Sequence, residues 1–259
     1  MKNAFWWLAL LVVLGGIGAA FYYWQKQEQT VTVPAAAPAP PPSAPAGEQH
    51  PVPAEENAKP LPTLTDSDRA VQEALGKLVG ADSLSSLFNL KDLIRRIVVT
   101  VDNLPREKLA QRLSPFKPVA GEFKAARSGA GLLIAPDNAG RYTPYVKLAQ
   151  AADTKSLVAA YIHFYPLFQQ AYVDLGYPNG HFNDRLIEAI DSLLATPDLP
   201  APPQLARPAV LYVYDDAQLE SLPVGQKILL RMGSANADLV KAKLREIRDA
   251  LTARTPASK

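Results

Sequence analysis

The chain has 259 residues, no cysteine and a formal net charge of +2 from 27 basic and 25 acidic side chains. The lack of cysteine excludes disulfides, iron–sulfur sites and thiol catalysis. The balanced charge, without a long basic run, argues against a nucleic-acid partner, which requires a clustered basic face. Since 48% of the residues are apolar, we expect a folded domain with its own core.

An apolar stretch without charges follows the short N-terminus 1–3 and covers the 21 residues 4–24, with aromatic residues at both ends. A helix of this length rises about 30 Å, the thickness of the hydrocarbon layer of a bilayer, and aromatic rings prefer the headgroup zone. We therefore predict a transmembrane helix over residues 4–24, with the lipid bilayer as its partner. The alternative is a signal peptide cleaved after Ala20, although signal peptides have shorter apolar regions.

The charges beside this stretch set the predicted orientation. Lys2 and the amino terminus precede it, whereas Lys26 follows it with Glu28 nearby. The positive-inside rule compares basic residues near the two helix ends, and an excess of about one charge favours a cytoplasmic N-terminus. The rest of the chain is then expected on the other side of the membrane.

Residues 25–62 are rich in proline and alanine and show no hydrophobic periodicity, with ten prolines between Pro34 and Pro62. Proline removes amide donors and fixes φ, which disfavours helices and sheets and favours an extended chain. This composition predicts a disordered stalk that separates the domain from the membrane. The alternative is a ligand for a proline-binding module.

The remaining residues, 63–255, are expected to form the domain, followed by a short tail 256–259. The acid at Asp68, three residues after Thr65, indicates a helix start, and Gly80 indicates its end. Residues 90–102 repeat apolar side chains at spacings of three and four, which predicts a second helix, with a strand over 97–101 as the alternative.

Shorter elements are expected in the middle of the domain. Pro105 suits the first turn of a short helix that reaches Leu113. Residues 128–131 resemble a turn, and residues 132–134 and 140–143 form a plausible hairpin. The pair Gly129 and Gly131 lacks the further residues of a phosphate-binding loop.

Residues 153–176 carry an aromatic stripe at helical spacing, which Pro166 is expected to kink or break. Such a stripe is typical of a core, and the alternative is a surface that stacks on carbohydrate or lipid. In that alternative Tyr165, Tyr172 and Tyr177 are the candidate binding residues of an aromatic cleft.

The C-terminal third alternates helices with short segments. Asn183 is expected to cap a helix over 184–195, and residues 209–214 resemble a strand. Residues 225–231 are too short to assign, and 236–254 predict a last amphipathic helix. The fold class is therefore mainly α, a single helical globular domain with a small β-hairpin or short strands, preceded by one transmembrane helix.

Several blocks in this order resemble a bacterial family of proteins with a domain of unknown function, family 3014. The blocks are residues 102–105, 164–168, 172–176, 180–186 and 230–233. The resemblance spans roughly residues 60–255 and includes the anchor and proline-rich layout. It implies a Gram-negative envelope protein, here a single-pass protein of the bacterial inner membrane with a periplasmic domain, and it implies no activity.

Candidate catalytic groups are few. The chain has three histidines, none in a zinc-binding signature, so we expect no metal site and no cofactor. The candidate catalytic residues are His181 as a base and Asp184, or in its place Asp174, as the carboxylate that orients it. The Gly-x-Ser-x-Gly nucleophile motif is absent.

Arg95 and Arg96 form the remaining candidate binding pair, on a helix whose other face is apolar. A guanidinium binds carboxylates and phosphates through a planar fork. The two arginines are expected either to pair with Asp174, Asp184 or Glu188 inside the domain or to bind an anionic envelope ligand.

The function that these features favour is a membrane-anchored periplasmic module without catalytic activity, which binds a protein or polymer of the cell envelope. The alternative is an envelope hydrolase that acts on cell-wall or lipid material and uses His181 with neighbouring acids.

Overall fold

A computed structural model describes residue 52, residues 60–129 and residues 131–253. The chain divides into two units, Met1–Pro45 and Ala46–Lys259, and the first lies outside the described residues. The predicted transmembrane helix 4–24, most of the predicted stalk 25–62 and the tail 256–259 also lie outside them. In the part of the chain that is described, no helix has both the length and the apolar character needed to cross a bilayer.

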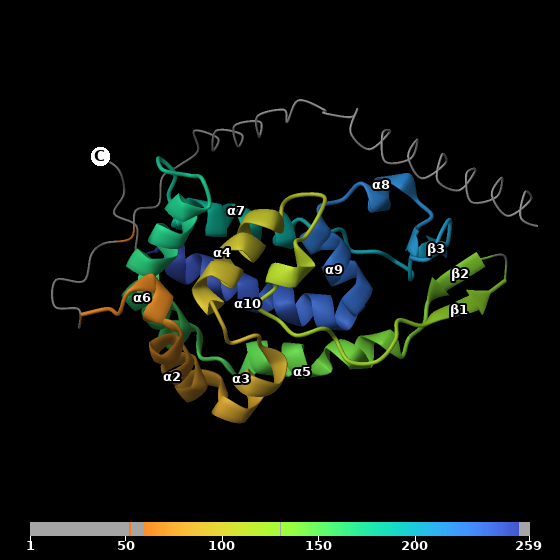
Figure 1. The fold of residues 1–259 in the computed structure, drawn as a ribbon. Coiled ribbons are helices and arrows are strands. Elements are labelled where there is room, and N and C mark those ends of the chain that lie inside the picture. Colours follow the sequence, from red (N-terminus) through yellow and green to blue (C-terminus); the bar gives the residue numbers. More distant parts are fainter. Residues whose placement is uncertain (1–51, 53–59, 130, 254–259) are drawn as a thin grey trace, which may run out of the picture. The chain divides into compact units, whose positions relative to one another are not determined.

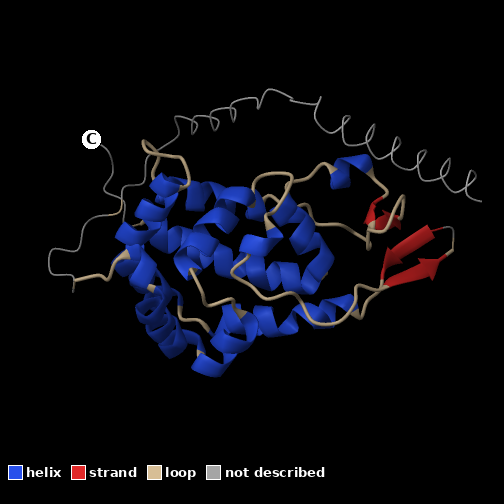
Figure 2. Cartoon of the chain, viewed as in Figure 1, coloured by secondary structure: helices blue, strands red, loops and turns tan. Residues whose placement is uncertain are grey.

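The second unit is mainly helical, with one small antiparallel sheet (Figures 1 and 2). The described α-helices are α2 (Asp68–Val79), α3 (Ala81–Leu87), α4 (Leu93–Asn103), α5 (Asn138–Ala151), α6 (Thr154–Asp174), α7 (Phe182–Leu194), α8 (Ala217–Glu220), α9 (Val224–Met232) and α10 (Ser234–Thr252). Single 3-10 turns lie at Leu64–Asp66 and Gln111–Leu113. The fold class predicted for the domain is thus confirmed.

Helix α6 contacts α2, α4, α7 and α10. It begins after Asp153, whose carboxylate accepts a hydrogen bond of 2.8 Å from the backbone amide of Ser156. It continues through Pro166 as a helix of 21 residues. A proline removes one backbone hydrogen bond, and packing on several sides outweighs that loss, so the predicted break does not occur.

The core lies between α4, α6 and α7. Leu93, Ile94 and Val98 of α4 are fully buried, as is Phe182 at the start of α7. The rings of Phe168 and Phe182 stack with centroids 5.5 Å apart, an arrangement that adds to the stability gained from burial alone. The alternative of a strand over 97–101 is wrong, because this segment is part of helix α4.

The sheet has the order β1–β2–β3–β4, from strands β1 (Ala125–Ser128), β2 (Gly131–Ile134), β3 (Gln204–Ala206) and β4 (Val213–Tyr214). Ser128 pairs with Gly131, Leu132 with Leu205, and Leu205 with Tyr214, all antiparallel. This register places the turn after β1 and the loop after β3 at the same end of the sheet. We call this end of the sheet the sheet tip. Its described residues are 127–129, at and after the end of β1, and 207–212, the loop after β3.

Several local predictions are wrong. Residues 140–143 belong to α5 rather than to a hairpin, and β2 pairs instead with β1 before it and with β3 far beyond it in the chain. The buried Asn138 holds the start of α5 in place by accepting a hydrogen bond from the amide of Lys124 at 3.0 Å. The predicted helix after Pro105 is only a 3-10 turn at its far end, and the strand predicted over 209–214 shrinks to β4. Residues 225–231, which had no predicted assignment, are part of helix α9.

Asn183 also differs from its predicted role as a helix cap. Helix α7 begins at Phe182, so Asn183 lies within its first turn and is buried. Its side-chain oxygen accepts a hydrogen bond of 3.0 Å from the hydroxyl of Tyr161. The residue therefore connects α7 to α6 rather than ending a loop.

Gly225 lets α9 approach the helices beside it. Its amide donates a hydrogen bond of 3.0 Å to the carbonyl of Leu104. A Cβ at this position would lie 2.8 Å from a side-chain carbon of Leu193 and 3.0 Å from that same carbonyl oxygen. A larger side chain would therefore push α9 away from α7 and from the end of α4.

Candidate functional site

A pocket of about 260 Å³ lies between α2, α4, α6, α7 and α10. Its wall consists of aliphatic and aromatic side chains, including Leu157, Ala160, Phe164 and Phe168 of α6. These positions follow the three- and four-residue spacing of one helix face, so the aromatic stripe seen in the sequence forms one side of the pocket. Val71 of α2 and the segment 247–251 of α10 complete other parts of the wall.

The single wall residue with a polar group is Tyr161, and its hydroxyl donates to Asn183. Burial raises the pKa of this tyrosine well above its usual value, so the group is neutral at physiological pH. The wall therefore offers no acid, base or nucleophile, and a ligand here would meet almost only carbon. Such a surface holds water poorly.

The pocket is partly open to the surface, so the free-energy cost of an enclosed core cavity does not apply to it. An apolar molecule in the pocket would remove more of the apolar wall from water, and this burial is favourable.

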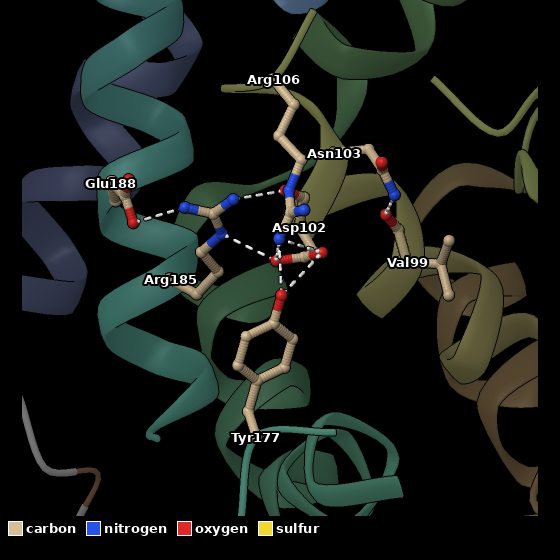
Figure 3. A network of polar contacts seen from close by, with 7 residues as sticks. All are labelled: Val99, Asp102, Asn103, Arg106, Tyr177, Arg185 and Glu188. Atoms are coloured by element: carbon tan, nitrogen blue, oxygen red, sulfur yellow. Dashed lines mark hydrogen bonds and ion pairs between the residues drawn. The ribbon is translucent and has the colours of Figure 1, made fainter. Parts of the chain in front are cut away.

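A second feature is a polar network around Asp102, shown in Figure 3. The Asp102 carboxylate pairs with Arg185 at 3.1 Å and with Arg106 at 3.0 Å. Both arginines also donate to the Asp102 backbone carbonyl. Arg106 donates to the hydroxyl of Tyr177, and Arg185 pairs with Glu188 at 2.6 Å. Two acids thus face two arginines, and the network is electrically balanced.

The network joins α4, α7 and the connection after α6, and its most buried members are Asp102 and Arg185. Their side chains are 7% and 13% exposed. Tyr172 stacks on Tyr177 with ring centroids 4.5 Å apart. Burial, followed by the charge of Asp102, raises the pKa of Tyr172 to about 12. Because its charges bind each other, the network fixes the packing of the helices.

The two catalytic candidates lie away from the pocket wall. His181 is exposed and precedes the first turn of α7, where its side chain makes no capping hydrogen bond. Asp184 is half-buried in that turn. Across the described ranges, no group of three or more His, Cys, Asp or Glu could hold a metal ion.

The five binding candidates do not meet in one place. Arg95 forms an ion pair of 2.9 Å with Asp174, and Arg96 donates to backbone carbonyls, with one bond of 2.8 Å to Lys91. The hydroxyl of Tyr165 donates to a neighbouring side chain on α6. Only the stacked pair Tyr172 and Tyr177 comes together, and Tyr172 is buried, so the rings do not form an open aromatic cleft.

The sequence interpretation did not single out the central residues of the network. Asp102 and Arg185 were visible only as members of the blocks that carry the family resemblance, because they lie 83 positions apart. The pocket had a clearer signal in the aromatic stripe of residues 157–168. Its other walls come from segments at both ends of the domain. Hydrophobic periodicity identifies the buried face of each helix but does not show which helices pack together.

A second pocket, of about 390 Å³, lies between α5, the connection 196–203 and the junction of α9 with α10. Its wall includes the buried Lys241, whose ammonium donates to the carbonyl of Thr196 and to the carboxylate of Asp198, both at 2.7 Å. This cation already has partners within the chain.

Comparison with known proteins gives one match. Residues 93–248 match the model of a family described as a protein of unknown function, DUF3014. No curated protein and no solved structure matches the chain. The matched range includes the whole Asp102 network and the α6 face of the pocket.

Proposed function

The chain belongs to the DUF3014 family of proteins of unknown function, and we propose that its folded domain is a non-catalytic module that binds an apolar ligand in the pocket beside α6. The observation that carries the proposal is the chemistry of the pocket wall, which consists of hydrocarbon and aromatic surface. Its one titratable group, the hydroxyl of Tyr161, is already bonded to Asn183. Ligand pockets are mostly apolar, and their few polar groups fix orientation. A wall without such groups suits an alkyl chain.

We further propose that residues 4–24 anchor the module in the inner membrane of a bacterial envelope and that the domain lies in the periplasm. The support is the uncharged apolar stretch with aromatic ends, followed by the proline-rich sequence of residues 25–62. Membrane lipid would then be both the anchor's partner and a nearby source of alkyl chains. An envelope protein or polymer remains the proposed wider partner, and no nucleic acid is proposed.

The hydrolase alternative receives less support. A catalytic histidine needs a nucleophile or second acid within hydrogen-bond reach in a substrate cleft. His181 is exposed and belongs to the wall of neither described pocket.

The test is photocrosslinking of the full-length protein in envelope membranes with a fatty acid that carries a diazirine on its alkyl chain. Mass spectrometry should find adducts on the pocket wall, for example in residues 157–168. Ala160→Leu adds volume inside the pocket, whereas Ala159→Leu places the same side chain on the exposed face of the same helix. We expect at least a fivefold loss of adducts for the first variant and no loss for the second.

A second pocket variant, Ala74→Leu, fills the space from α2. It tests the same pocket if Ala160→Leu prevents folding. Adducts confined to residues 4–24, with equal yields for all variants, would show that the reagent reaches the protein only from the bilayer and would refute the proposal.

A further inference from the structure

The sheet tip carries the most exposed large apolar side chains among the described residues. Val210 and Leu211 are 80% and 77% exposed, whereas the other exposed large apolar residues range from 38% to 45%. They are neighbours in the loop between β3 and β4. Single exposed apolar residues are common on protein surfaces and need no explanation, so an interaction site at this pair also requires suitable charges beside it.

The tip is also basic. The strand register brings Arg127 at the end of β1 and Arg207 after β3 to the same end of the sheet, and both are exposed. Neither forms an ion pair with an acid among the described residues. Asp215 follows β4 and its amide donates to the carbonyl of Gln204, so this acid lies towards the opposite end.

Aromatic rings lie beside the arginine of the loop. The guanidinium of Arg207 lies 5.1 Å from the ring centroid of Tyr212. That ring in turn packs against Phe123 at 5.5 Å. Tyrosine and arginine both carry an apolar body with a polar end, and such side chains prefer the boundary between hydrocarbon and water.

We propose that the sheet tip inserts Val210 and Leu211 into the surface of an anionic bilayer, with Arg127 and Arg207 on the lipid phosphates. The tip consists of a few residues on two narrow connections, too small for the roughly 800 Å² that each partner buries in a stable protein interface. A fluid bilayer can surround such a loop, and basic residues beside apolar ones strengthen its binding to anionic lipid.

This surface is separate from the pocket. The sheet lies at one end of the described unit and α2 and α6 at the other, as Figure 1 shows. The inference therefore goes beyond the proposed function and does not depend on the pocket ligand.

The experiment uses the full-length protein, whose lack of cysteine allows a single fluorescent label. Leu211→Cys places the label on the tip, and Leu175→Cys is the control at a second exposed leucine beyond the end of α6. Each protein is labelled with a nitrobenzoxadiazole maleimide and reconstituted into vesicles with spin-labelled lipid. One set contains phosphatidylcholine and phosphatidylglycerol at about 7:3, and the other contains phosphatidylcholine alone.

We expect lipid quenching at position 211 to exceed that at position 175 at least twofold in the anionic vesicles. The difference should fall to less than half in neutral vesicles or when both tip arginines are replaced (Arg127→Gln and Arg207→Gln). Equal quenching at the two positions would overturn the proposal. Quenching at position 211 that is the same in anionic and neutral vesicles would also overturn it. Protection of the 211 label from iodide by envelope protein extracts, without lipid quenching, would instead assign the tip to a protein partner.

Discussion

The buried carboxylate of Asp102 offers the sharpest test of the network that joins α4 to α7. Asp102→Asn keeps the shape of the side chain and removes its charge. Arg185, which is 13% exposed, then keeps only Glu188 as an anionic partner. Removing one member of a buried ion pair costs about 3–5 kcal/mol, because the remaining charge stays buried without compensation.

The magnitude should be somewhat smaller here for two reasons. Glu188 still pairs with Arg185 at 2.6 Å, and the backbone carbonyl of residue 102 still accepts from both arginines. We therefore expect a loss of about 2–3 kcal/mol in the free energy of unfolding. With a denaturant slope of about 2 kcal/mol per molar, the urea midpoint should fall by about 1 M.

The assay is urea unfolding of the full-length protein in a mild detergent, followed by far-ultraviolet circular dichroism. Glu188→Gln is the matched control, since this side chain is 43% exposed and its loss should cost at most about 1 kcal/mol. The variant Arg185→Met and the double variant complete a cycle, in which the double variant should be little worse than the worse single one. Equal effects of Asp102→Asn and Glu188→Gln would refute the assignment of Asp102 as a buried structural charge.

Three further predictions concern packing, pH and an exposed ion pair. Gly225→Ala should destabilise the domain by about 1–3 kcal/mol through overpacking. Gly140→Ala, where a Cβ meets nothing within 4 Å, should be neutral or stabilise the domain by up to about 1 kcal/mol. The same urea titration compares the two variants, and equal changes in the free energy of unfolding would contradict the close approach of α9. Folding raises the pKa of Tyr172 to about 12 from about 10 in the unfolded chain, so the folded state binds the phenolic proton more tightly. The free energy of unfolding should therefore fall between pH 10 and pH 12, by up to about 3 kcal/mol. Tyr172→Phe should flatten this decline, and an unchanged slope would argue against the raised pKa. Arg95→Gln should cost less than about 1 kcal/mol because Arg95 and Asp174 are both well exposed, and a larger loss in thermal unfolding would mean that the pair is more buried than the structure shows.

The helical part of the fold was predictable because its periodicity is local. The apolar spacing of residues 90–102 reports one buried face and predicts α4 to within a few residues. The apolar spacing of residues 236–254 likewise predicts the last helix, α10. The break that was one of the two outcomes predicted at Pro166 does not occur. The cost of an internal proline depends on how firmly the flanking turns are packed, and the sequence does not contain that information.

The sheet and the network were not predictable for a common reason. The hairpin partner of residues 131–134 is β1, which lies before them in the chain, and their second partner is the distant strand β3. Asn138, which reads as a turn residue, holds the start of a helix through side-chain bonds to Lys124. Asp102 and Arg185 meet across 83 positions. Contacts between such distant residues leave no local pattern in a single sequence, so only the tertiary structure shows them.

The pocket wall is built from both ends of the folded unit, from α2 near its start and from Leu251 near the close of α10. During synthesis the α6 face therefore remains without its last wall until almost the entire domain has left the ribosome and, for a protein exported across a membrane, the translocation channel. Until that moment the apolar face is a natural contact for a chaperone. Truncation before α10 should accordingly yield a chain that aggregates, even though the helices it retains can still form.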